Sequence, residues 1–444
     1  MILSRAVVRP GFRLSWPLPI VCCCTRHFPL FLAGGAGIVA QVVGTSLLGH
    51  QATARLAAFA LVSAVLTPVS AAVSGGLRGM SPFVATCRDR PDEALALLKD
   101  ARWLSLGLGA AGAGVVLCVP VIARIGGAPR EVIAEFGALP LLFALHVLLS
   151  AVGGGANGAL VALGRSRLVL RSSLPSTAVE VVLLLVLAPS MGVEGVGVAL
   201  VTSTALALTV SNTLLLWQCG GSGWSPRPRP REILRMAKVG LPMSATLVVK
   251  FTALGAVTYA AARTGAHGAA AHAVLMSLHG IVGLASLATG QALTPEIARA
   301  ATPREARRLA RAALTIVTGA ALAGGLVLLR FGEEVFRLFT SDAEVLASAV
   351  ALVPLFAVHT VAGNCGVVLG SALMGLRRSS WNLATAVVGY GLLALVMTPM
   401  ATTWGMAGLW TALTVASVLI LTAQAVIFVR NVRLSASVAG GQVT

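Results

Sequence analysis

The sequence predicts an all-α integral membrane protein with about twelve transmembrane helices, arranged as two pseudo-symmetric six-helix lobes. Three observations predict this fold: the composition, the recurrence of long apolar stretches, and an internal repeat. Of the 444 residues, 57% are hydrophobic and only 11% are charged, and the mean hydropathy is +0.89. A soluble domain carries about twice that share of charged residues, so water is not the main solvent of this chain.

Apolar stretches recur from Phe28 almost to Val429. A bilayer core takes roughly 20 apolar residues per helix, which is the typical length of these stretches. We expect spans at residues 28–49, 56–77, 103–123, 137–160, 172–190, 195–218, 239–262, 268–293, 311–329, 345–371, 381–402 and 405–428.

The spans divide the chain into two lobes, at residues 28–218 and 239–429. Residues 1–27 and 430–444 are expected to be cytoplasmic tails. Between the lobes, residues 219–238 include a run rich in glycine, proline and arginine that cannot continue a helix. We expect this segment to be a cytoplasmic interlobe linker.

The formal net charge of +18 would suit nucleic acid only if the basic residues shared one surface. They do not. With the amino terminus inside, most of the 33 Lys and Arg residues fall in the segments on one side, with clusters around Arg88, Arg231 and Arg307. Cytoplasmic loops of membrane proteins carry such an excess. We therefore expect a multi-pass protein of the cell (plasma) membrane, with both termini cytoplasmic and no nucleic-acid partner.

An internal repeat relates residues that lie 213 positions apart. Phe143, Ala144 and His146 pair with Phe356, Ala357 and His359 at that offset, and Gly192 and Gly195 pair with Gly405 and Gly408. A basic turn after the fourth span of each half, Gly164–Arg167 and Gly375–Arg378, matches with a displacement of two residues. Two related bundles that move against each other around a central site are a common route to alternating access.

Several short motifs resemble the multidrug and toxin extrusion (MATE) family. They are Gly240-Leu241-Pro242, Ala270-Ala271-His272, Phe339-Thr340-Ser341-Asp342 and Gly192-Val193-Glu194-Gly195. Their order and spacing cover nearly the whole chain. Residues 255–293 look most similar to the bacterial branch related to DNA-damage-inducible (DinF-like) membrane proteins.

The resemblance implies a V-shaped pair of bundles around a central cavity, which exports substrate while protons or sodium ions move inward. It also implies acids at four positions. Here Gly44, Lys250 and Asn364 occupy three of them, and only the carboxylate of the fifth span, Glu180, remains.

Glu180 and Lys250 carry charge inside predicted spans. An ionised acid at the centre of a membrane helix costs roughly 2.5 to 3.5 kcal/mol, so Glu180 should face the cavity or be protonated. We interpret it as a candidate proton-coupling site, against the alternative of a protonated acid bonded to a neighbouring helix. Lys250 lies too deep to reach either interface and needs a partner. Glu180 across the cavity, an anionic substrate, or backbone carbonyls could supply one. Alternatively, the ammonium acts as a fixed cation in place of the imported ion.

Neutral polar residues are the remaining cavity candidates. Asn157 and Asn364 lie in glycine-rich stretches where an amide can bond across closely packed helices. Thr202, with Ser203 and Thr204, could line the same cavity as Glu180. His272 matches a position that the family often fills with histidine, whereas the paired positions of His146 and His359 favour shared packing.

No ATP-binding, metal-ligand or nucleophile motif occurs, so we expect neither an enzyme nor a bound cofactor or metal. The predicted function is secondary active efflux of a small organic compound, such as a drug or secondary metabolite, as a proton antiporter. Sodium is disfavoured because one carboxylate among neutral groups makes a poor site for a hard cation. The partners are therefore a small-molecule substrate, protons and the lipid bilayer, and we expect a monomer. The alternatives are a flippase for lipid-linked intermediates, which should have several cavity cations, and a decayed, non-transporting membrane protein.

Overall fold

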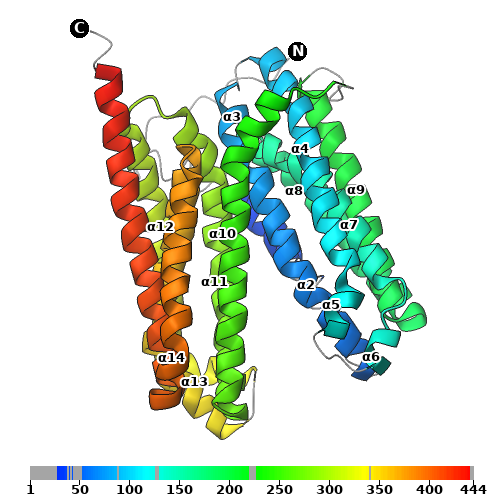
Figure 1. The fold of residues 1–444 in the computed structure, drawn as a ribbon, viewed down its shortest axis with the longest axis vertical. Helices are drawn as coiled ribbons and strands as arrows, with labels where there is room; N and C mark the ends of the chain where they lie inside the picture. Colours follow the sequence, from blue (N-terminus) through cyan, green and yellow to red (C-terminus); the bar gives the residue numbers. More distant parts are fainter. Residues whose placement is uncertain are drawn as a thin grey trace, which may run out of the picture.

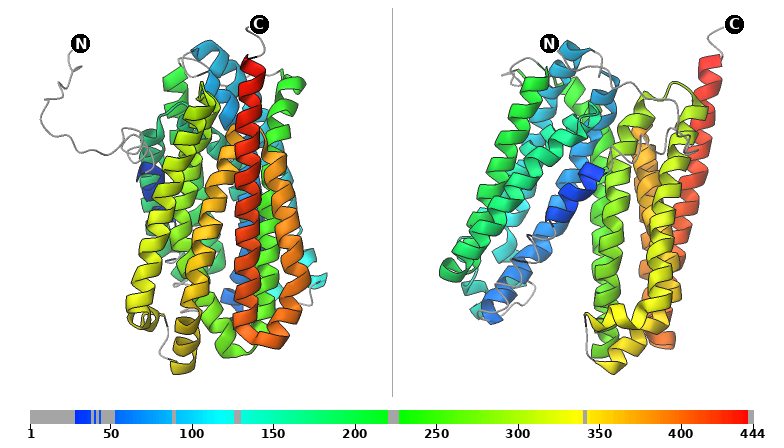
Figure 2. Two further views of the ribbon diagram at one scale, coloured as in Figure 1. Left: turned by 90° about the vertical axis from the view of Figure 1, so that its left-hand side faces the viewer. Right: turned by 180° about the vertical axis from the view of Figure 1, so that it is seen from behind.

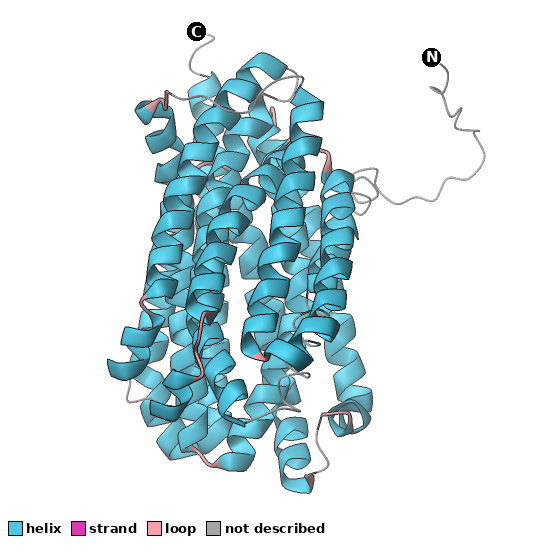
Figure 3. Cartoon of the chain, turned by 90° about the vertical axis from the view of Figure 1, so that its right-hand side faces the viewer, coloured by secondary structure: helices cyan, strands magenta, loops and turns pink. Residues whose placement is uncertain are grey.

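The computed structural model describes residues 28–37, 40, 43, 53–87, 90–125, 130–219, 227–339 and 342–440. Within these ranges the regular structure is entirely helical (Figure 3). The helices in chain order are Phe28–Gly37, α2 (Thr53–Leu77), η1 (Arg78–Met80, a 3₁₀ turn), α3 (Ser81–Thr86), α4 (Pro91–Leu117), α5 (Val119–Ile125), α6 (Arg130–Ala134), α7 (Leu139–Ala162), α8 (Ser166–Met191), α9 (Val193–Cys219), α10 (Pro230–Arg263), α11 (Ala266–Arg299), α12 (Pro303–Arg337), α13 (Ala343–Gly375) and α14 (Ser379–Gly440).

The described helices account for the expected spans. Nine are long and apolar enough to cross a membrane, and the bent pair α4–α5 makes a tenth span. The 62-residue α14 contains a non-helical kink at Gly405, which divides it into two spans. The shorter apolar helix Phe28–Gly37 lies where the first span is expected. The predicted membrane fold is thus confirmed.

The helices form two bundles that lean together at one end and diverge at the other (Figures 1 and 2). The N-terminal bundle contains α2 to α9, and the C-terminal bundle contains α10 to α14. We call the end where η1 and α3 lie the closed end, because the two bundles pack against each other there.

The 213-residue register holds for whole elements. α11 corresponds to α2, η1 and α3 together, α12 to α4 and α5, and α13 to α6 and α7. Even the irregularities recur: the break at Cys118 corresponds to the non-helical Phe331 in α12. Gly192 and Gly405 both have positive φ, of 60° and 56°. Glycine adopts that conformation without steric cost, so the same residue makes the same corner in both halves.

The basic turns keep this register, which corrects the displacement of two residues that sequence matching indicated. Gly164 and Arg377 are the equivalent positions, and both have positive φ, of 76° and 59°. Each is followed by a backbone hydrogen bond of the same kind, from Arg165 to Leu160 and from Arg378 to Leu373, both at 2.8 Å. The Arg377 guanidinium lies 4.3 Å from the ring centroid of Phe83, a cation–π contact between the bundles.

The start of α10 differs from the prediction. The seventh span was expected to begin at residue 239, but α10 begins at Pro230, so the last part of the predicted linker is helical. Proline is well suited to the first turn of a helix, where no backbone donor is needed. Just before the helix, Arg229 pairs with the buried Asp100 of α4 at 2.6 Å. The hydrogen bond that Arg229 donates to this carboxylate raises the pKa of Arg229 and holds the start of α10 against the N-terminal bundle.

Close backbone packing joins the bundles at the closed end. A Cβ atom at Gly79 would overlap the backbone of Gly240, and one at Gly240 would overlap the carbonyl oxygen of Gly76. Ser244 donates a hydrogen bond to the carbonyl of Ala72 at 2.7 Å. The absence of side chains thus allows α10 to contact α2 and η1 directly.

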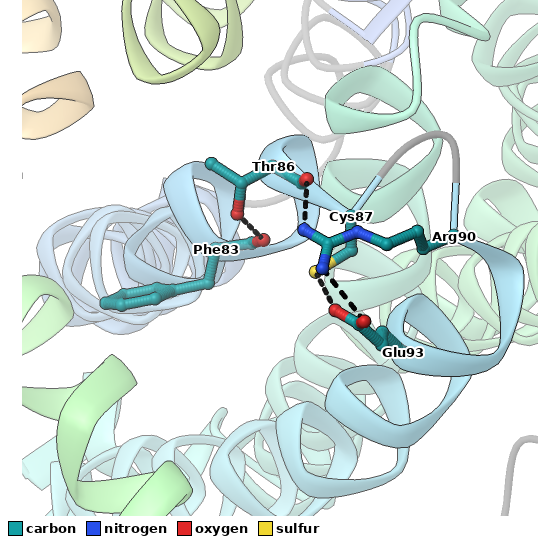
Figure 4. Close-up of polar contacts among 5 residues, drawn as sticks. All are labelled: Phe83, Thr86, Cys87, Arg90 and Glu93. Carbon is teal, nitrogen blue, oxygen red and sulfur yellow. Dashed lines mark hydrogen bonds and ion pairs between the residues drawn. The ribbon is translucent and has the colours of Figure 1, made fainter.

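A second contact at this end involves Arg299 at the end of α11. It donates to the carbonyl of Ala162 at the end of α7, 2.7 Å away, and pairs with Glu296 at 2.7 Å. Just before α4, Arg90 donates to the carbonyl of Thr86 of α3 at 3.4 Å and pairs with Glu93 of α4 at 2.8 Å (Figure 4).

The glycine contact predicts unequal responses to alanine along α10. Gly240→Ala should destabilise the protein by about 1 to 3 kcal/mol, because the added methyl group overpacks a backbone contact. Gly255→Ala, on the same helix with no atom within 4 Å of the new Cβ, should leave stability unchanged or raise it. Thermal unfolding of the purified variants in detergent measures both effects. Equal melting temperatures would contradict the close contact.

Candidate functional site

Two cavities lie between the bundles. The C-terminal cavity, of about 440 Å³, is bounded by α10, α11, α13 and α14, with α2 and η1 on its other side. The N-terminal cavity, of about 320 Å³, is bounded mainly by α2, η1 and α7, with residues of α11 and α13 opposite. Ser74 and Arg78 line both cavities. The two cavities are therefore neighbouring parts of one central region.

The charge on the cavity walls is positive. Lys250 lines the C-terminal cavity, Arg78 lines both, and no acidic side chain of the described residues lines either. Within the described ranges, neither Lys250 nor Arg78 forms an ion pair with an acid. The site therefore holds two basic groups, one from each bundle, without a carboxylate from the walls.

The sequence did not indicate Arg78 as a cavity residue, because the second span was expected to end at residue 77. In the structure the helical path continues through η1 into α3, and the apolar segment runs over Leu61–Thr86. The signal was the apolar run Phe83-Val84-Ala85 after Arg78, which extends the stretch beyond a single charge.

Asn364 and Asn157 line the C-terminal and N-terminal cavities, respectively. The Asn364 amide oxygen accepts a hydrogen bond from Ser286 at 2.7 Å, and its nitrogen donates to the carbonyl of Thr360 at 2.8 Å. Asn157 accepts from Ser211 at 2.8 Å. Both amides connect neighbouring helices, as the glycine-rich surroundings predicted.

A further amide pair was not predicted. Gln424 donates to the side-chain oxygen of Asn382 at 2.6 Å, and both residues line the C-terminal cavity. A Cβ atom at Gly370 would come within 2.8 Å of that oxygen, so the small residue leaves room for the pair. Gln424 and Asn382 lie 42 positions apart, and only helix packing brings them together.

The duplicated histidines make equivalent contacts. His146 Nδ1 lies 2.8 Å from the hydroxyl of Thr204, and His359 Nδ1 lies 3.0 Å from the hydroxyl of Ser417. Thr204 and Ser417 are themselves 213 positions apart. This supports the interpretation that His146 and His359 share an inherited packing role. The C-terminal half adds His279, whose ring lies 4.9 Å from that of His359 and lines the cavity.

Glu180 does not lie on the wall of either cavity. It is partly buried and accepts a hydrogen bond from Ser203 of α9 at 3.2 Å. The predicted pair with Lys250 across the cavity is absent from the structure, because α8 packs mainly on α9 within its own bundle. The contact with Ser203 supplies the bond to a neighbouring helix that one of the two alternatives required, and the role of Glu180 as a proton-coupling site stays a prediction.

Thr202 and His272 also lie away from the two cavities. Thr202 is exposed on α9, whereas its neighbour Ser203 is buried and points to Glu180. His272 is 2% exposed, lies 3.4 Å from the hydroxyl of Thr258 and packs 5.6 Å from the Trp410 ring. His272 is therefore a packing residue of the C-terminal bundle in this structure. Gly44 lies outside the described residues.

The described residues contain no group of three His, Cys, Asp or Glu side chains that could hold a metal ion. What the arrangement offers is an apolar hollow with basic and amide groups on its walls. Such a hollow can bind a small organic molecule by burying its body and bonding its polar end.

The His359–Ser417 contact predicts a measurable loss on truncation. Ser417→Ala should destabilise the protein by about 1 kcal/mol, because a buried hydrogen bond is lost. Ser417→Thr, which copies Thr204 of the other half, should retain the stability. Thr422→Ala on the exposed face of α14 serves as the control. Thermal unfolding of the three variants in one detergent is the measurement, and an equal loss in Ser417→Ala and Thr422→Ala would argue against the contact.

Comparison with known proteins gives a consistent assignment. Residues 242–400 match the MatE family model. A probable multidrug resistance protein NorM of Aromatoleum aromaticum is 27% identical over 399 residues, covering 82% of this chain and 83% of that protein. Another of Xanthomonas campestris is 25% identical over 429 residues, covering 90% of both chains. Because these relatives are named NorM, the DinF-like branch stays a prediction.

Solved structures share the fold. The Vibrio cholerae MATE transporter VcmN in the bent form matches with a TM-score of 0.80 at 17% identity, over 94% of this chain and 97% of that chain. A MOP superfamily transporter from Pyrococcus furiosus, described by the reverse polarity of its binding pocket, matches with a TM-score of 0.81 at 16% identity, over 94% and 96%. The family model, the full-length relatives and the shared two-bundle fold agree: over most of its length this chain is similar to members of the multidrug and toxin extrusion family.

Proposed function

We propose that this protein is a secondary active efflux transporter that exports a small organic compound by alternating access. The observation that carries the proposal is the pair of cavities between two related bundles that pack together at one end only. The names of the relatives, multidrug resistance proteins, support the same function. A rocking motion of one bundle against the other would open the cavities to the opposite side.

The closed end is proposed to be the cytoplasmic one. Arg165, Arg299 and Arg377 lie at helix ends there, in the segments that the positive-inside rule assigns to the cytoplasm. This conformation is then closed toward the cytoplasm, and it corresponds to the stage of the cycle at which substrate leaves outward. Breaking the Gly79–Gly240 and Arg299–Ala162 contacts would accompany the return to the inward-facing state.

Protons are proposed as the coupling ion, with Glu180 as the titrating group. Its bond to Ser203 ties its protonation to the packing of α8 on α9 rather than to direct contact with substrate. Sodium is disfavoured because a hard cation needs several oxygen ligands with negative charge, and the cavity walls carry no carboxylate.

The proton proposal is tested in proteoliposomes with imposed gradients. An inward proton gradient should drive efflux of a fluorescent substrate, and Glu180→Gln should abolish this dependence because the amide cannot take up a proton. The exposed Glu334→Gln serves as the matched control. Full-rate, pH-driven transport by Glu180→Gln would exclude Glu180 as the coupling site, and a response to sodium alone would exclude proton coupling.

Lys250 offers a second test of coupling. Lys250→Glu places a carboxylate where the related family has one, so transport should become dependent on the coupling ion at that position. Rates measured with proton and sodium gradients in turn would reveal the change. An ion dependence identical to that of the unmodified chain would show that residue 250 has no part in coupling.

A flippase for lipid-linked intermediates is the second candidate. The specific observation in its favour is Arg78, which raises the number of basic groups on the cavity walls from the single Lys250 expected from the sequence to two. Export is retained as the leading proposal because the relatives are efflux proteins by name and two cations are few for a phosphate-rich headgroup.

A further inference from the structure

We propose that the transported substrate is an amphipathic organic anion, whose carboxylate, sulfonate or phosphate group binds between Arg78 and Lys250. This inference rests on the proposed export function and names its substrate class. The two basic groups come from opposite bundles, Arg78 from η1 and Lys250 from α10, and both line the C-terminal cavity.

The acids of the chain lie elsewhere. No acidic residue precedes Asp89 in the sequence, so the first two spans supply none. Glu180 is the one acid in the middle of a long helix, and it bonds to Ser203 away from the cavities. The other acids in the described part of the chain lie near helix ends or, like Asp100, pair with an arginine. An organic cation in the central region would therefore meet two positive charges and no negative one.

The cost of placing the charges of Arg78 and Lys250 in a low-dielectric region favours an anion as their partner. A charge in a low-dielectric region is costly unless an opposite charge accompanies it. Arg78 and Lys250 have no acidic partner among the described residues, so an anion from outside the chain is the partner that would offset the cost of burying their charges. An anion held by one group from each bundle would also draw the bundles together, which links binding to the conformational cycle.

The chemistry of Arg78 favours an oxyanion. A guanidinium presents several donors in a plane that matches two oxygens of a carboxylate or phosphate, and such charge-assisted hydrogen bonds are strong. Arg78 also lines the N-terminal cavity, so it can keep contact with the anionic group of a ligand that occupies either cavity.

The rest of the C-terminal cavity suits an apolar body. Its wall includes the side chains of Leu247, Phe251, Leu254, Met276 and Ile420. At about 440 Å³, the space is in the range of sites for small organic ligands. A molecule with one anionic end and a compact apolar body therefore fits both the charge and the surface.

The test uses two probes with the same fluorophore and opposite charge: dansylglycine, an anion, and dansylcadaverine, a cation. Binding to the full chain in nanodiscs of zwitterionic lipid is followed by fluorescence anisotropy, with no ion gradient. Dansylglycine should bind more tightly, and Arg78→Gln and Lys250→Gln should each weaken its binding about tenfold by removing a charge-assisted bond. Dansylcadaverine should bind to these variants at least as tightly as to the unmodified chain.

Exposed basic residues serve as matched controls. Lys238→Gln lies on the same helix as Lys250, and Arg167→Gln removes an exposed arginine. Neither should change dansylglycine binding. Lys250→Glu should reverse the preference in favour of dansylcadaverine. If one of the two cavity variants does not fold, judged by its melting temperature, the other still tests the proposal because each removes one cation.

Three results would overturn the proposal: no binding of dansylglycine, tighter binding of dansylcadaverine to the unmodified chain, or equal losses in the cavity variants and the controls. Competition then distinguishes the source of the anion. Displacement of dansylglycine by farnesyl phosphate but not by dodecanoate supports a lipid-linked phosphate, and the opposite result supports a soluble carboxylate.

This binding assay is separate from the transport test. Charge-dependent anion binding without gradient-driven transport would support the proposed ligand class and contradict the proposed export function. Gradient-driven export of dansylcadaverine that is unchanged in the Arg78 and Lys250 variants would support the export function and contradict the proposed anionic substrate.

Discussion

The close backbone contact of η1 and α2 with α10 is the constraint on which the rest of this structure depends. Gly76, Gly79 and Gly240 carry no side chains, so the two bundles approach to backbone distance there. Because that contact lies at one end only, the bundles diverge beyond it and leave the two cavities between them. It also places Arg78, the residue before Gly79, where both cavities meet.

The two halves are alike in packing and unlike in chemistry. Gly192 and Gly405 make the same corner, and His146 and His359 meet equivalent hydroxyl groups. The basic residues of the cavities are not repeated between the halves. At the offset of 213, Lys250 corresponds to Gly37, and Arg78 corresponds to Gln291. Duplication thus explains the scaffold, and the residues that differ between the halves give the central region its charge.

The position of Glu180 shows which property of a charged membrane residue the sequence predicts and which it does not. Its depth in the membrane was evident, and depth argues for a partner or a proton. The partner of Glu180 depends on the rotation of α8 about its axis, which decides the direction in which this side chain points. The structure turns it toward Ser203 on α9, within one bundle, and leaves the cavity walls to Lys250 and Arg78.

The sequence by itself determined the helical fold, the number of spans, the two related halves and the membrane setting. These properties arise from local composition and from a repeat that can be read along the chain, since a bilayer demands apolar helices of a set length. The cavity positions of Asn157, Asn364 and Lys250 could also be anticipated, because polar groups in apolar helices face protein or a cavity rather than lipid. Only the tertiary structure decided that Arg78 joins Lys250, that Gln424 meets Asn382, and that Glu180, Thr202 and His272 lie elsewhere. The reason is physical: the rotation of each helix about its axis and its approach to its neighbours result from packing between distant segments, which hydropathy along the chain does not record.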